Sequence, residues 1–262
     1  MTETSPTLPA DAKQIRSGVL AGWTLGEFSA AEMSFPTYRR GSGPAVLVIH
    51  EIPGITPTVA QFANDVVERG FTVVMPSLVG SPERESSQLS VAQSMMKICI
   101  AKEFTTMALN KTSPVIAWLR ALARNVHNEV GGPGVGAVGM CFSGGFALGM
   151  MVDDIMLAPV LAQPSMPFAV GKKERGANLN VSPDDEAAII QRAQDGCQVL
   201  GLRFTDDKLV GNRFATLREK LGDAFIAIEL PSTAKSDHST LTKQRDEASV
   251  QSVLNFFAEK LL

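Results

Sequence analysis

The sequence predicts an α/β fold, in which helices cover both faces of a mostly parallel central sheet. Short apolar runs rich in β-branched residues alternate with stretches of helical periodicity along most of the chain. The chain has 262 residues, 45% of them hydrophobic, so it can bury a large core. We find no internal repeat or linker in the sequence. We therefore expect one domain over residues 21–262, preceded by a flexible polar arm over residues 1–20.

The order of the predicted elements supports this fold class. Residues 23–35 contain several β formers, and a Gly-Ser-Gly-Pro turn leads into the apolar run 45–49, which is typical of a buried parallel strand. Ser113-Pro114 and Ser182-Pro183 are residue pairs favoured at helix starts. The other expected strands are 71–75, 135–140, 157–161, 199–204 and 225–230; the expected helices are 56–68, 90–109, 113 to about 130, from 144, from 182, 214–221 and from 247.

Composition and charge exclude several classes of function. The formal net charge is −3, so no basic surface for nucleic acid or anionic lipid is expected. The N-terminus lacks the apolar core of a signal peptide, and no uncharged stretch approaches the roughly 20 residues of a membrane span. Three scattered cysteines suggest neither a disulfide framework nor a metal site. We expect a cytoplasmic protein without metal or cofactor, a monomer or small homo-oligomer, whose partner is a small-molecule substrate.

The segment from Gly139 to Gly145 carries the strongest chemical signal. An apolar strand leads into it and a helix leads out, which places Cys141 on a sharp turn among small residues. Such a turn directs a helix N-terminus at the sulfur, which favours the thiolate. The N–H of Phe142 would be one oxyanion donor. Ser143 is an alternative nucleophile, and a buried structural thiol is an alternative role for the cysteine; the glycine two residues before Cys141 favours the cysteine as nucleophile.

Asp207 and His238 each follow a predicted strand, so both are expected at the sheet edge where the cysteine turn lies. The chain order of nucleophile, acid and histidine is that of the α/β-hydrolase fold, which narrows the predicted fold class to that fold. His238 is the only one of the three histidines in this position. Asp206 is an alternative acid, but the spacing Asp-x-x-Val favours Asp207.

The loop directly after the strand 45–49 supplies a further candidate group. It has the sequence His50-Glu51-Ile52-Pro53-Gly54. This is where the fold places its second oxyanion donor, for which the N–H of Ile52 is the candidate. Loop solvation or capping is the alternative role for His50 and Glu51.

Together these segments resemble the dienelactone hydrolase family over about residues 40–262. The resemblance implies that Cys141 attacks a carbonyl and forms an acyl-enzyme. His238 would accept the thiol proton, pass it to the leaving group and then activate water, while Asp207 orients the imidazole. Glu51 matches the family glutamate that pairs with the resting thiol.

The sequence also departs from that family. Two arginines hold the substrate carboxylate in dienelactone hydrolases, and this chain has Thr242 and Ser81 at the matching positions. Arg84 lies near the second position and is a candidate substitute. Ser165, in the irregular stretch 163–183, is a second candidate for substrate binding, and this loop with Met150-Met151 could shape a more apolar pocket.

These residues favour a hydrolase that cleaves a small-molecule ester, lactone or thioester by cysteine nucleophilic catalysis. The alternative is a non-catalytic binding or sensor protein that keeps the α/β-hydrolase fold, because the arginine clamp is missing. A redox-sensing thiol is a third hypothesis, although no resolving cysteine lies nearby in the sequence.

Overall fold

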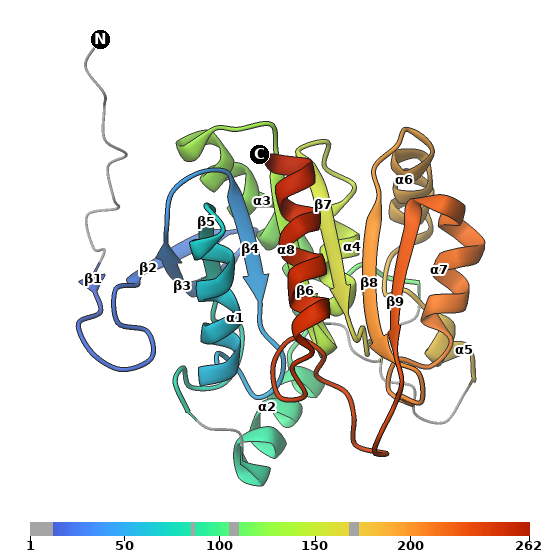
Figure 1. Cartoon of the computed structure of the whole chain (residues 1–262), viewed down its shortest axis with the longest axis horizontal. Helices are drawn as coiled ribbons and strands as arrows, with labels where there is room; N and C mark the ends of the chain where they lie inside the picture. Colours follow the sequence, from blue (N-terminus) through green and yellow to red (C-terminus); the bar gives the residue numbers. More distant parts are fainter. Residues whose placement is uncertain (1–12, 85–86, 105–109, 168–172) are drawn as a thin grey trace.

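One nine-stranded sheet extends through the part of the chain that the computed structural model describes, which is residues 13–84, 87–104, 110–167 and 173–262 (Figure 1). The strand order is β1-β2-β3-β5-β4-β6-β7-β8-β9; the first three strands are antiparallel, and the strands from β5 to β9 run parallel to one another. The strands are β1 Lys13–Gln14, β2 Thr24–Ala30, β3 Met33–Arg40, β4 Ala45–Ile49, β5 Thr72–Pro76, β6 Val135–Met140, β7 Met156–Ala162, β8 Val199–Phe204 and β9 Phe225–Leu230. The predicted α/β-hydrolase fold class is thereby confirmed.

Helices cover both faces of the sheet (Figure 1). Helices α1 and α8 pack on one face and α3, α4, α6 and α7 on the other, while α2 and α5 lie beyond the carboxyl ends of the strands. The helices are α1 Pro57–Glu68, α2 Gln88–Ile100, α3 Pro114–Val130, α4 Gly144–Met150, α5 Lys173–Ala177, α6 Pro183–Gln194, α7 Arg213–Leu221 and α8 Glu247–Leu261, with 3₁₀ turns at Cys141–Ser143 and Gly222–Ala224.

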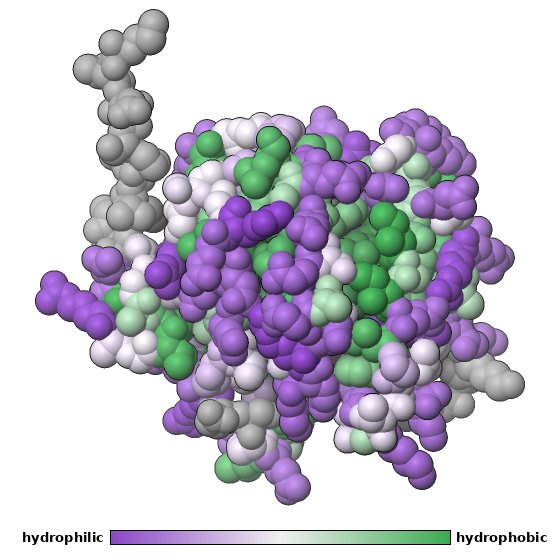
Figure 2. All heavy atoms as spheres, in the orientation of Figure 1, coloured by the Kyte–Doolittle hydropathy of each residue, from purple (hydrophilic) through white to green (hydrophobic). Residues whose placement is uncertain are grey.

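Alternating side chains of the buried strands feed two separate cores. In β4, Val46 and Val48 belong to the core under α1 and α8, while Leu47 and Ile49 belong to the opposite core. The surface over α1 and α8 is mostly hydrophilic, and apolar side chains gather over β8 and β9 (Figure 2). This two-sided burial explains the continuous apolar runs in the sequence.

Most predicted elements match the structure, and the differences have tertiary causes. The expected helix over 90–109 ends at Ile100, and residues 105–109 lie outside the described residues. Ser113 precedes α3 as predicted, but its hydroxyl donates to the Phe104 carbonyl at 2.7 Å instead of capping the helix. Of the expected arm, residues 1–12 lie outside the described residues, and Lys13–Gln14 pair with β2.

The described residues contain no helix that is both long and apolar enough to cross a membrane. Nor do three or more His, Cys, Asp or Glu side chains come together there as a possible metal site. The polar loops that follow β4, β6, β7, β8 and β9 instead meet at the carboxyl edge of the sheet, where the candidate residues lie.

Candidate active site

Cys141 occupies a sharp turn between β6 and α4. Its φ of +56° is in the left-handed region, which a side chain with a Cβ rarely adopts, and the residue is 8% exposed. The turn is crowded: a Cβ added at Gly139 would lie 2.0 Å from the Ser143 carbonyl oxygen, and one at Gly144 would lie 2.6 Å from the Cα of Pro164. Glycine is therefore required at both positions, as in a nucleophile turn.

Ser143, the alternative nucleophile, is fully buried below this turn. Its hydroxyl accepts the N–H of Met140 at 2.9 Å and lies within 2.9–3.0 Å of the carbonyl oxygens of Ile49, His50 and Met140. These bonds tie the end of β4 to the end of β6, so the hydroxyl has no path to a substrate. The geometry favours Cys141 as the reactive group of the pair.

His238 and Asp207 form a close pair at the same sheet edge. The imidazole Nδ1 lies 2.6 Å from Oδ2 of Asp207, and Oδ1 of Asp207 accepts the N–H of Leu209 at 3.0 Å. Asp206, the alternative acid, is exposed, and its own N–H donates to the Ser232 hydroxyl. Asp207, and not Asp206, therefore contacts the imidazole of His238.

The environment of His238 strongly favours its protonated form. Burial alone would lower the pKa of the imidazole, but its interactions with Cys141 and with Asp207 raise the pKa to about 11. The arrangement therefore places the Cys141 thiol and the Asp207 carboxylate around one imidazole.

The loop before His238 is shaped by Asp237. Its carboxylate accepts the N–H groups of Thr233 at 2.7 Å and Ala234 at 2.8 Å, and these bonds keep the pKa of Asp237 below its ordinary value. A carboxylate that bonds back to a preceding turn fixes the course of the chain. The next residue, His238, is consequently presented to Asp207 from an ordered loop.

Glu51 lies in a buried set of neutral donors. Its carboxylate accepts hydrogen bonds from the Ser239 hydroxyl at 2.8 Å, from the Thr242 hydroxyl, and from the amide Nε2 of Gln163 at 3.3 Å. The side-chain oxygen Oε1 of Gln163 in turn accepts the Thr240 hydroxyl at 2.8 Å. Glu51 therefore ties the loop after His238 to the loops that follow β4 and β7.

The two predicted oxyanion donors come from the cysteine turn and from the loop after β4. The N–H of Phe142 falls in the first turn before α4, where such groups have no intrahelical acceptor. Ile52 is half-buried in the loop after β4, and its N–H donates to no acceptor among the described residues. Both N–H groups are thus available for a developing oxyanion.

His50 is a buried structural residue. Its Nδ1 donates to the Glu51 carbonyl at 2.8 Å, and its Nε2 accepts the N–H of Leu78 at 3.0 Å. Burial lowers the pKa of His50 to about 4, so the imidazole is neutral at ordinary pH. His50 therefore bridges the loops after β4 and β5. This role is neither loop solvation nor capping, the two roles that the sequence leaves open.

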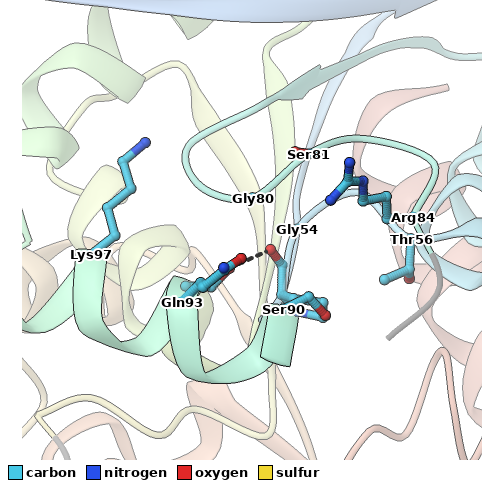
Figure 3. Close-up of a pocket in the computed structure, with 10 residues that line it drawn as sticks. Gly54, Thr56, Gly80, Ser81, Arg84, Ser90, Gln93 and Lys97 are labelled. Carbon is cyan, nitrogen blue, oxygen red and sulfur yellow. Dashed lines mark hydrogen bonds between the residues drawn. The ribbon is translucent and has the colours of Figure 1, made fainter. Parts of the chain in front are cut away.

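Ser165 and Arg84, the candidate substrate-binding residues, have different surroundings. The N–H of Ser165 donates to the Cys141 carbonyl at 3.0 Å, while its hydroxyl donates to the Gln163 carbonyl at 2.9 Å. Arg84 is exposed and lines a cleft of about 230 Å³ with Lys97 (Figure 3). Cys141 does not line this cleft, so the structure brings Ser165 to the cysteine turn and leaves Arg84 in a separate depression.

Sequence reasoning missed the polar residues that brace the site. Ser239 and Thr242 bond to Glu51 across 188 and 191 positions of the chain, and Gln163 follows β7 with a left-handed φ of +37°. The rule that polar residues after parallel strands gather at one edge could have identified Gln163. Nothing local marks the two hydroxyls as partners of Glu51.

The parallel sheet, the strained cysteine turn and the His238–Asp207 pair define a protein of the α/β-hydrolase class. A profile of the dienelactone hydrolase family matches residues 33–261, and the chain belongs to that family. It is accordingly a hydrolase of the dienelactone hydrolase type. No curated protein is significantly similar to the chain in sequence.

Solved structures share the fold at low sequence identity. A cold-adapted esterase from an Arctic intertidal metagenomic library has a TM-score of 0.61 and 16% identity, with 98% of this chain and 100% of that chain covered. A dienelactone hydrolase-like promiscuous phosphotriesterase from metagenomic libraries has a TM-score of 0.62 and 16% identity, covering 91% and 98%. The 2,6-dihydroxy-pseudo-oxynicotine hydrolase has a TM-score of 0.59 and 15% identity, covering 91% and 68%. At these identities the likeness establishes the fold alone.

Proposed function

We propose that the chain hydrolyses small uncharged esters, lactones or thioesters through an acyl-enzyme on Cys141. The observation that carries the proposal is the His238–Asp207 pair, with 2.6 Å between Nδ1 and Oδ2, beside a cysteine whose φ is +56°. A nucleophile, a base and a group that orients the base are the minimum for acyl transfer.

The reaction would proceed in two halves. The Cys141 thiolate attacks the carbonyl carbon, and the N–H groups of Ile52 and Phe142 stabilise the oxyanion. The carbon–oxygen or carbon–sulfur bond to the leaving group then breaks, and His238 donates its Nε2 proton to that group. His238 next takes a proton from water, and the hydroxide cleaves the thioester to release the acid and restore the thiolate–imidazolium pair.

The preference for uncharged substrates follows from the surroundings of Glu51. Thr242, which stands where the family has an arginine, donates its hydroxyl to the Glu51 carboxylate. The site therefore offers no cation at this position for a substrate carboxylate. Two structural neighbours are an esterase and a phosphotriesterase, so uncharged esters of both kinds belong in a substrate panel.

Acylation by p-nitrophenyl acetate tests the proposal directly. Intact-mass spectrometry should show one added acetyl group, and C141A should abolish both this adduct and steady-state hydrolysis. S143A is the matched control, because it removes a neighbouring hydroxyl on the same turn. Full activity in C141A with loss in S143A would assign the chemistry to the serine, and no adduct or turnover across the panel would favour the binding or sensor protein.

A further inference from the structure

Arg213, the first residue of α7, is buried to 1% exposure without a carboxylate among its described hydrogen-bond partners. Its guanidinium instead donates all five of its N–H groups to backbone carbonyls, six in number because the Nε–H is shared by two of them. Nε donates to Met166 and Asn178, Nη1 to Leu209 and Val210, and Nη2 to Pro167 and Arg175.

Two of the loops that supply these carbonyls contact the candidate site. Met166 follows Ser165, whose N–H donates to the Cys141 carbonyl at 3.0 Å. Leu209 donates its own N–H to Asp207 at 3.0 Å while its carbonyl accepts from Arg213 at 3.0 Å. One side chain thus joins the loop that touches the nucleophile to the loop that carries the acid.

The charge of Arg213 also acts at the acid. Burial lowers the pKa of Arg213 to about 10, and the negative charge of Asp207 opposes that shift. The interaction is reciprocal, so the guanidinium attracts the Asp207 carboxylate and helps to hold it in place. Burying a cation that bonds only to neutral carbonyls costs desolvation free energy, and this cost indicates that Arg213 has a role beyond packing.

We propose that Arg213 is a positioning residue, which fixes the Asp207 loop against the Ser165 loop and so holds the Asp207 carboxylate against the imidazole of His238. Asp207 in turn sustains the imidazolium of His238 and with it the Cys141 thiolate. The inference rests on the proposed function for its effect on turnover, but its effect on the thiol can be measured without substrate.

The test compares R213M and R213K with the wild type. The rate of alkylation of Cys141 by iodoacetamide is followed from acid to alkaline pH by peptide-resolved mass spectrometry, which separates Cys141 from Cys99 and Cys197. R192M is the matched control, since Arg192 also donates to three carbonyls, those of Met151, Asp154 and Met156, but at the opposite end of β7.

In R213M we expect the alkylation rate at neutral pH to fall about tenfold and the pH midpoint of the reaction to rise by about one unit. R213K keeps the charge and three donors, so it should fold. Its alkylation rate and pH midpoint should lie closer to those of the wild type than the values for R213M do. R192M should lose stability without changing either quantity. If R213M does not fold, R213K decides: a wild-type rate and midpoint there would overturn the proposal, as they would in a folded R213M.

The two proposals fail in different ways. Turnover retained in C141A would remove the proposed function and leave the alkylation result standing as a measure of loop positioning. An unchanged alkylation profile in the Arg213 variants, with turnover abolished in C141A, would keep the proposed function and reduce Arg213 to a structural residue.

Discussion

His50, which is buried, and His238, which is half-buried, lie at the same edge of one sheet, and their pKa values move in opposite directions. Burial among backbone partners lowers the pKa of His50 to about 4. Burial also lowers the pKa of His238, but interactions with Cys141 and Asp207 outweigh it and raise the pKa to about 11. Burial alone therefore favours a neutral imidazole, and polar or charged side-chain partners can reverse that preference.

Removing the charge beside His238 should have the largest effect. D207N keeps the size of the side chain but withdraws the carboxylate that fixes the imidazole tautomer and stabilises the imidazolium. We expect kcat for p-nitrophenyl acetate to fall by about a thousandfold or more. Steady-state kinetics with circular dichroism as a folding control measures this; a loss smaller than tenfold would show that His238 does not depend on Asp207.

His50 should matter for stability instead, and only in acid. Its folded pKa lies below its ordinary value of 6.5, so the unfolded chain binds the proton first as the pH falls. The stabilisation is present above about pH 6.5 and is lost by about pH 4, which amounts to about 3 kcal/mol.

Urea unfolding at a series of pH values tests this against H50Q, whose amide can donate and accept but does not titrate. The difference between the two curves should decline from pH 6.5 to pH 4 and be flat above. The pKa shift of His238 has the opposite sign: its contribution to stability is present below the ordinary pKa of 6.5 and is lost as the pH rises toward about 11. A difference curve for H50Q that stays flat in acid would show that His50 is already protonated in the fold.

The sequence predicts the fold well because its signals are local. Apolar runs at 45–49 and 135–140 need only neighbouring residues to mark a buried strand, and the Gly139–Cys141 turn is likewise a short segment. The carboxyl edge rule also brings Asp207 and His238 together without any tertiary information. These features could be predicted because each depends on chain order or spacing.

The rest of the site depends on contacts between distant segments. In the sequence, Thr242 stands where the family has a substrate-binding arginine, whereas in the fold its hydroxyl donates to Glu51, 191 positions away. Arg213 resembles any helix-start arginine until its six carbonyl partners are known. The resemblance likewise pairs Glu51 with the thiol, but the described hydrogen bonds of its carboxylate come from Ser239, Thr242 and Gln163.

The hydroxyls around Glu51 give an intermediate effect. T242V keeps the shape of the side chain and leaves one carboxylate oxygen of Glu51 without that donor. Removing a buried hydrogen bond to a charged group should lower the free energy of unfolding by about 2 kcal/mol. Urea titration measures the loss, with S239A as a parallel variant; no loss in either would show that water replaces these donors.

Substitution of Asp206 should have the smallest effect on kcat and stability. D206N is therefore the control for D207N in the comparison of the histidines. Its side chain is exposed and it precedes the residue that contacts the imidazole. D206N changes the same charge by the same chemistry one position away, so general electrostatic effects on His238 are shared with D207N. We expect kcat within about twofold of the wild type and stability within about 0.5 kcal/mol. A large loss in D206N with little change in D207N would move the acid of the triad to Asp206 and reverse the assignment made from the fold.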